Sequence, residues 1–92
     1  MQYVLITGSS GLVGSESSTF FHNKNFKVLG VDNDNRSYFF GSSASTKKMA
    51  NRLKRDLKNY QHFNIDIRNI KNLEKIFKKY KNKIKCIIHT AA

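Results

Sequence analysis

Short apolar runs and helix-compatible segments alternate along the whole chain. The apolar runs have the length of buried strands, and the segments between them repeat apolar residues at the spacing of a helix face. This pattern predicts strands at 2–7, 26–32, 62–66 and 84–89, and helices at about 12–23, 46–60 and 69–81. Regular alternation of strands and helices is typical of an α/β protein with a parallel sheet.

The three expected helices differ in how regular their apolar face is. The segment 69–81 has near-ideal helical spacing, with lysines opposite, in Ile70, Leu73, Ile76, Phe77 and Tyr80. The segment 46–60 has a narrower stripe formed by Met49, Leu53, Leu57 and Tyr60. The segment 12–23 is rich in serine and has a low helix propensity, so burial must stabilise it. The residues expected to provide that burial are Leu12, Val13, Phe20 and Phe21.

Three glycines follow the first apolar run and open the first expected helix. Gly8 can adopt a positive φ, Gly11 lets a phosphate approach the backbone, and Gly14 allows the helix to pack tightly on the strand. The amides best placed to bind the phosphates at the helix start are those of Ser10, Gly11, Leu12 and Val13. The spacing therefore predicts a dinucleotide-binding βαβ unit, the alternative being a purely structural glycine turn.

An acidic residue ends the second apolar run. Asp32 lies 18 residues beyond Gly14, close to the roughly 20 residues that separate glycines and ribose-binding acid in dinucleotide sites. Its carboxylate would accept hydrogen bonds from the adenosine ribose and repel the 2′-phosphate of NADP, which favours NAD. Arg36 is the feature that could accommodate a 2′-phosphate instead. Asp32 could also cap a turn, because Asp-Asn sequences favour turns.

These motifs constrain the order of the strands. Right-handed crossovers in a half-Rossmann chain give the sheet order 3-2-1-4, with the first two helices on one face and the third on the other. The sequence thus predicts the N-terminal half of an NAD(P)-binding Rossmann fold, with the last strand at an exposed edge.

Four motifs in order cover the whole chain. They are Thr7-Gly8-x-x-Gly11-x-x-Gly14, Asp32-Asn33, Asn64 to Arg68, and Ile87 to Ala92. Together they resemble the extended short-chain dehydrogenase/reductases, in particular the NAD-dependent nucleotide-sugar epimerases and dehydratases. The segment from Val31 through Gly41 is similar to the branch of CDP-paratose 2-epimerases.

The resemblance implies further cofactor-binding residues. Asp66 would reach the exocyclic amine of adenine and Ile67 would pack on the ring, unless they are an ordinary strand-end acid and core isoleucine. Asn33 follows the ribose-binding acid. Thr90, Ala91 and Ala92 would line the ribose and nicotinamide side of the cofactor.

The family's catalytic motif is Tyr-x-x-x-Lys, and none of the four tyrosines here is followed by lysine at that spacing. We therefore expect no catalytic residue in this chain, and residues 1–92 are expected to form a partial Rossmann domain without its C-terminal half or substrate domain. A nucleotide sugar would bind only if a C-terminal half were supplied. The alternatives are a non-catalytic remnant that binds a nucleotide or a partner, and a basic module associated with nucleic acid.

The net charge of +11 lies entirely in the second half of the chain, where basic residues outnumber acidic ones by 14 to 3. A basic face can attract nucleic acid, but the basic residues are not interleaved with aromatic residues as in RNA-binding modules, and no recognition-helix pattern is present. Solvated lysine-rich helix faces are the favoured interpretation.

The remaining chemistry is sparse. One cysteine, Cys86, is expected to be a small core residue in a reducing cytoplasm. The three histidines lack metal-ligand spacing, and His89 is expected to be buried at a strand end, bonded to backbone.

No apolar run approaches the length of a membrane span. The exposed last strand favours self-association, and Tyr38-Phe39-Phe40 in the loop 33–45 could form a partner-binding patch or pack on the sheet.

Overall fold

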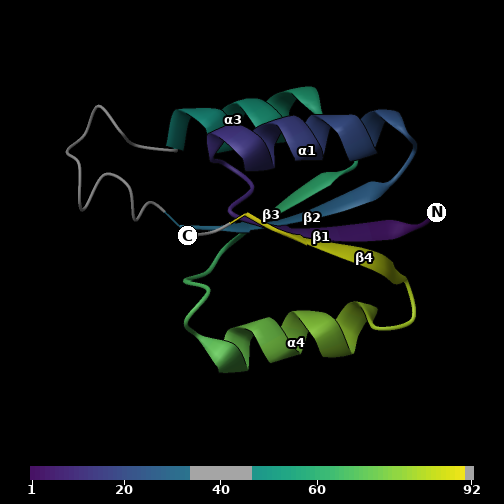
Figure 1. Ribbon diagram of the computed structural model, residues 1–92, viewed down its shortest axis with the longest axis vertical. Helices are drawn as coiled ribbons and strands as arrows, with labels where there is room; N and C mark the ends of the chain where they lie inside the picture. The colour runs from purple at the N-terminus through teal and green to yellow at the C-terminus, as the bar shows by residue number, and fades with distance from the viewer. Residues whose placement is uncertain (34–46, 91–92) are drawn as a thin grey trace.

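The computed structural model describes residues 1–33 and 47–90. It contains strands β1 (Tyr3–Thr7), β2 (Lys27–Asp32), β3 (Tyr60–Asn64) and β4 (Ile84–His89), and helices α1 (Leu12–Asn23), α3 (Lys47–Asp56) and α4 (Ile70–Tyr80). Figure 1 shows this alternation along the chain. Arg36 and the Tyr38-Phe39-Phe40 triplet lie outside the described residues.

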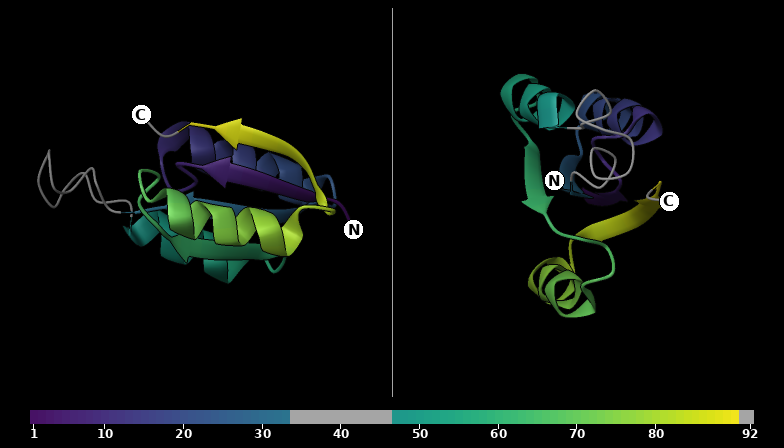
Figure 2. Two further views of the ribbon diagram at one scale, coloured as in Figure 1. Left: turned by 90° about the horizontal axis from the view of Figure 1, so that it is seen from below. Right: turned by 90° about the vertical axis from the view of Figure 1, so that its left-hand side faces the viewer.

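The four strands form one parallel sheet in the order β3-β2-β1-β4. Val28 of β2 pairs with Val4 of β1 and with Tyr60 of β3, and β1 also pairs with β4 on its other side. Strands β2 and β1 therefore lie at the centre. The end-on view in Figure 2 shows α1 and α3 on one face of the sheet and α4 on the other. The predicted fold class, strand order and placement of the helices are confirmed.

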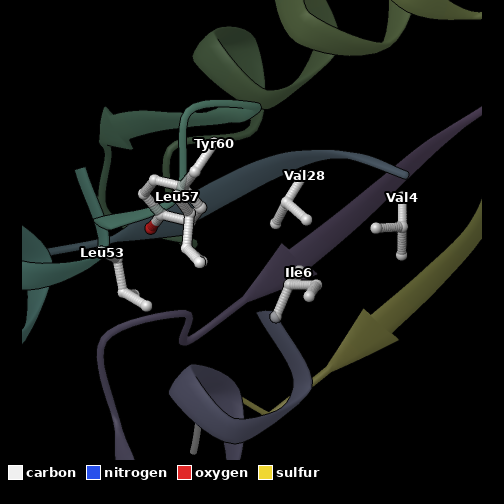
Figure 3. Close-up of a cluster of buried hydrophobic side chains, with 6 residues drawn as sticks. All are labelled: Val4, Ile6, Val28, Leu53, Leu57 and Tyr60. Carbon is white, nitrogen blue, oxygen red and sulfur yellow. The ribbon is translucent and has the colours of Figure 1, made fainter. Parts of the chain in front are cut away.

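The core has two parts, one on each face of the sheet. Beneath α1 and α3 lies the cluster drawn in Figure 3, formed by Val4, Ile6, Val28, Leu53, Leu57 and Tyr60. Beneath α4 lies the second cluster, formed by Leu5, Leu29, Val31, Ile76 and Tyr80. Successive residues of β1 and β2 point to opposite faces, so these central strands are apolar at nearly every position.

The face that α1 presents to the sheet was predicted wrongly. Leu12, Val13 and Phe20 are 74%, 63% and 56% exposed, and of the four expected apolar residues only Phe21 packs against the core. The buried residues of the helix are Gly14, Ser15 and Ser18. The Ser15 and Ser18 hydroxyls donate to carbonyls three and four residues earlier, so small side chains are buried with their polar groups satisfied.

The second helix was predicted to extend too far. α3 ends at Asp56, and Tyr60 begins β3 instead of ending the helix. A tight turn connects them, in which the Tyr60 amide donates to the Leu57 carbonyl at 3.1 Å. Leu57 and Tyr60 pack in the same cluster as Leu53. Their spacing in the sequence is therefore that of a helix face, although the helical backbone ends before them.

An irregularity in β4 changes which face its side chains cover. Tyr3 pairs with Ile84 and Val4 pairs with Cys86, so Lys85 is left between the two pairs as a bulge. As a result Ile84 packs in the α4 cluster, whereas Cys86 and Ile88 pack in the other. Ile87 lies on the α4 side and stays 51% exposed.

Candidate functional site

The predicted site residues gather where the parallel strands end. The glycine turn follows β1, Asp32 ends β2 and Asn33 follows it, Asp66 and Ile67 follow β3, and Thr90 follows β4. Carboxyl ends of parallel strands lie at one edge of a sheet, which is where open α/β folds bind ligands. Ala91 and Ala92 lie outside the described residues.

The glycine turn is fastened to the end of β2. Gly8 has φ 72°, a left-handed conformation that disfavours a side chain, as its position in the motif predicted. Its amide donates to the Val31 carbonyl at 2.7 Å, and its own carbonyl accepts from the Gly11 amide at 3.0 Å. The turn is therefore held against β2 by backbone hydrogen bonds.

Gly11 and Gly14 differ in what surrounds them. A Cβ at Gly14 would overlap the Gly8 carbonyl and lie 2.9 Å from the Ser9 Cα, so this glycine is required for α1 to pack on the turn. A Cβ at Gly11 would meet only the Gly8 carbonyl oxygen, at 3.4 Å. Packing within the described residues therefore does not require glycine at position 11.

The N-terminus of α1 is suited to bind an anion. Its N-cap is Gly11, which has no side chain to cap the first amides, and the first turn carries no acidic residue. The amides of Leu12 and Val13 therefore lie at the positive end of the helix dipole. The hydroxyl of Ser10 is buried and has no hydrogen-bond partner within the described part of the chain.

Asp32 links the end of β2 to the glycine turn. Its Oδ2 accepts a hydrogen bond from the Ser10 amide at 2.8 Å, and its Oδ1 accepts one from the Asn33 amide at 2.8 Å. Asp32 thus caps the turn, which was one of the two roles its sequence position suggested. A carboxylate oxygen can accept more than one hydrogen bond, so a ribose hydroxyl can share the same group.

Asp66 is held by its neighbour Arg68. The guanidinium donates to both carboxylate oxygens, with Nη2 at 2.6 Å from Oδ2, and the Arg68 amide donates to Oδ1 at 2.9 Å. These hydrogen bonds, followed by the charge of Arg68 and a bond from the Asn33 side chain, lower the pKa of Asp66 to about 2. The carboxylate is therefore ionised at neutral pH and is held by Arg68.

Thr90 folds back on the glycine turn. Its hydroxyl donates to the Thr7 carbonyl at 2.6 Å and contacts the Gly8 carbonyl at 3.2 Å. Beside it, the Thr7 hydroxyl lies 2.6 Å from Nδ1 of His89. His89 is exposed and bonded to a side chain, so the expectation of a buried histidine bonded to backbone was wrong. The residue ends β4, an edge strand that among the described residues pairs with β1 alone.

One group of residues near the turn was not recognised in the sequence. The Tyr60 hydroxyl lies 2.9 Å from Oγ of Ser9 and 3.0 Å from Nδ1 of His62, beneath the glycine turn. Burial is the main cause that raises the pKa of Tyr60 to about 12 and also the main cause that lowers the pKa of His62. Gly30, a glycine inside a strand, was the available signal, because such a residue indicates close approach of another group.

Two negative findings concern the described residues 1–33 and 47–90. No cluster of histidine, cysteine or acidic side chains in them could hold a metal ion. None of their helices has the length and apolar character needed to cross a membrane.

The strand order and the glycine turn are those of a Rossmann fold. Residues 5–92 match the family model described as GDP-mannose 4,6 dehydratase. The chain therefore belongs to this family of nucleotide-sugar epimerases and dehydratases, as its motifs suggested. A similar curated protein is UDP-glucuronate 4-epimerase of Thermodesulfobacterium geofontis, 37% identical over 93 residues that span 100% of this chain and 27% of that protein.

Similar folds occur among solved structures. The UDP-Glc/GlcNAc 4-epimerase of Campylobacter jejuni superposes with a TM-score of 0.75 at 22% identity, covering 100% of this chain and 25% of that one. The dTDP-glucose 4,6-dehydratase of Bacillus anthracis, solved in complex with NAD, gives 0.71 at 19% identity, covering 100% and 27%. The chain thus spans about a quarter of the length of these relatives.

Proposed function

We propose that residues 1–92 are the NAD-binding N-terminal part of an enzyme of the nucleotide-sugar epimerase/dehydratase type. The observation that carries this proposal is the glycine turn at the carboxyl ends of the strands. In it Gly8 has a positive φ, Gly11 is open to a ligand, and Asp32 is anchored beside the helix N-terminus. NAD bound to the B. anthracis dehydratase, which has the same fold, supports the choice of ligand.

Each part of NAD has a proposed set of contacts. The pyrophosphate would accept hydrogen bonds from the amides of Leu12 and Val13, with Gly8 and Gly14 shaping the turn. The amides of Ser10 and Gly11, also expected to bind it, already donate to Asp32 and to the Gly8 carbonyl, so these two residues would line the phosphates without donating to them. Asp32 would bind the adenosine ribose, with Asn33, Asp66 and Ile67 around adenine. Thr90, Ala91 and Ala92 would line the nicotinamide side. The bound cofactor would supply the acceptor for a hydride from a sugar carbon, and this chain would hold and orient it.

We propose NAD over NADP as the cofactor. Asp32 supports this preference, because an ionised carboxylate at the ribose repels a 2′-phosphate. Its two oxygens already accept amide hydrogen bonds, which favour the ionised form. NADP stays the less favoured alternative.

The activity of the whole enzyme is a further proposal. Similar proteins are named for UDP-linked and dTDP-linked sugars, which supports a nucleotide sugar as the substrate class. These 92 residues contain no Tyr-x-x-x-Lys motif, so we propose that they bind the cofactor without turning over a sugar. The lack of this motif also favours a second candidate, a non-catalytic nucleotide-binding module.

For the cellular compartment we propose a reducing cytoplasm, which the free thiol of Cys86 supports.

Calorimetric titration with NAD and NADP tests the proposed function. We expect wild-type chain to bind NAD more tightly than NADP. Asp32→Asn removes the charge and keeps one of the two acceptors for the backbone amides. It should weaken NAD binding by about 1.5–3 kcal/mol and narrow the difference in affinity between the two cofactors. Asp56→Asn is the matched control, because Asp56 is exposed at the end of α3 and pairs with Arg55.

The outcomes separate the possible interpretations. An unchanged NAD/NADP ratio in Asp32→Asn would contradict the ribose role of Asp32. Failure of the wild-type chain to bind either dinucleotide, with its secondary structure intact, would overturn the proposed function. An effect of the same size in Asp56→Asn would indicate a general consequence of net charge, since that residue lies away from the strand ends that carry the site.

A further inference from the structure

A buried chain of polar side chains lies beneath the glycine turn. Ser9 is fully buried and Tyr60 is 7% exposed. The Tyr60 hydroxyl donates to Oγ of Ser9 at 2.9 Å and lies 3.0 Å from Nδ1 of His62. Ser9 is a residue of the turn itself, whereas Tyr60 and His62 belong to β3, the far edge of the sheet. A side chain from β3 therefore reaches across β2 to the loop that follows β1.

Gly30 makes this crossing possible. It lies in β2, between the pairing partners Ile6 of β1 and His62 of β3. A Cβ at this position would overlap the Tyr60 hydroxyl and lie 2.6 Å from Cζ of its ring and 2.7 Å from Oγ of Ser9. The tyrosine thus occupies the space that any other residue at position 30 would fill.

The hydrogen bond to Ser9 is therefore built into the core. A buried hydroxyl without a partner costs free energy, and here the available partners are Ser9 and His62. Ser9 is covalently followed by Ser10, whose amide is bound by Asp32 at 2.8 Å. Two adjacent residues of the turn are consequently anchored from two different strands, Ser10 from the end of β2 and Ser9 from β3.

We propose that Tyr60 is a positioning residue of the NAD site, which fixes the pyrophosphate-binding amides by holding Ser9 from beneath. Tyr60 acts through the turn, by way of its hydrogen bond to Ser9. The inference rests on the proposed function, because it assigns to this tyrosine a share of the cofactor affinity. It also explains the pair Ser9 and Gly30, one supplying the acceptor and the other the space.

Tyr60→Phe tests the proposal, because it removes the hydroxyl and keeps the ring in the core. We expect NAD affinity to fall roughly 3- to 10-fold, the range of one net hydrogen bond. The matched control is Tyr80→Phe. Tyr80 is 9% exposed, belongs to the α4 cluster, and its hydroxyl lies 3.4 Å from Oε1 of Gln61. Tyr80→Phe should lower the melting temperature about as much as Tyr60→Phe does, but it should leave NAD affinity unchanged within twofold.

A double-mutant cycle with Ser9→Ala separates positioning from general destabilisation. If Tyr60 acts through Ser9, the double variant should bind NAD no more weakly than the weaker-binding of the two single variants. Losses that multiply in the double variant would show two independent structural effects and overturn the proposal. So would a Tyr60→Phe variant that binds NAD like wild type.

Amide hydrogen exchange gives a readout that does not depend on the cofactor. In Tyr60→Phe the amides of Ser10 and Gly11 should exchange faster than in wild type by a larger factor than amides in the middle of β1 and β2. Equal acceleration throughout would indicate global destabilisation and overturn the positioning role. If wild-type chain fails to bind NAD while this local effect is present, the proposed function is wrong and Tyr60 anchors a turn with another purpose.

Discussion

At the scale of single residues, the carboxylates at the strand ends are bound by the protein itself. Asp32 accepts hydrogen bonds from two backbone amides, and Asp66 accepts hydrogen bonds from the Arg68 guanidinium. Such contacts fix the position and charge of each group before a ligand arrives, which reduces the cost of ordering them on binding. The sequence predicted that both acids lie at strand ends, but it could not reveal that Arg68 would bind both oxygens of Asp66, since that depends on the turn between β3 and α4.

The pair Asp66 and Arg68 predicts a pH dependence. The pKa of Asp66 is about 2 in the folded chain, below the ordinary value of about 3.9 expected on unfolding. The stabilising contribution is therefore complete above about pH 4 and is lost as the pH falls toward about 2. In Arg68→Gln the Asp66 pKa should rise toward the ordinary range. Carboxyl chemical shifts followed by NMR between these pH values would measure it, and an unchanged midpoint would contradict the assignment to Arg68.

At the scale of elements, the sequence predicted the order of strands correctly and one helix face wrongly. The order follows from the alternation of elements and the handedness of crossovers, which depend little on detail. The face of α1 could not be predicted from hydrophobicity, because a helix beside a glycine turn approaches the sheet through its smallest residues, Gly14, Ser15 and Ser18. Leu12, Val13 and Phe20 consequently point elsewhere and stay exposed.

The sequence likewise predicted one part of the candidate site's geometry, the glycine turn with Asp32, and missed another, the contact between Tyr60 and Ser9. The glycines and Asp32 form a local motif whose spacing carries its own geometry, so their positions were predictable from the sequence. The contact between Tyr60 and Ser9 joins residues 51 positions apart and depends on where β3 begins. The sequence placed Tyr60 at the end of a helix, and from there its hydroxyl could not be assigned to the turn.

Gly11, the N-cap of α1, and Gly14, within α1, should respond differently to alanine. Gly14→Ala should destabilise the chain by about 1–3 kcal/mol, since its Cβ has no room beside the Gly8 carbonyl, although alanine normally stabilises a helix interior by about 1 kcal/mol. Gly11→Ala should leave stability nearly unchanged, because its Cβ fits, whereas Gly11→Val should abolish NAD binding while secondary structure persists.

Denaturant unfolding and NAD titration of the three variants would distinguish these effects. A stabilised Gly14→Ala would contradict the close packing of α1 on the turn. Wild-type NAD affinity in Gly11→Val would place the phosphates elsewhere and make the turn purely structural.

At the scale of the whole molecule, the two faces of the sheet are covered unequally. Helices α1 and α3 cover one face, and α4 is the one helix in the described residues that covers the other. On that second face Ile87 of the edge strand β4 is 51% exposed, and Phe77 of α4 is 36% exposed. Edge strands with apolar side chains favour pairing with another chain, and a small core leaves little stability in reserve.

We therefore predict that the chain self-associates through the β4 edge and melts at a temperature that depends on its concentration. Ile87→Lys should shift the population toward monomer in sedimentation velocity, because a charged side chain on an edge strand opposes pairing. Phe20→Lys is the matched control, because Phe20 is 56% exposed on α1, and it should leave association unchanged. A monomeric wild-type chain with a sharp, concentration-independent transition would contradict the prediction, since these 92 residues would then be stable with the β4 edge unpaired.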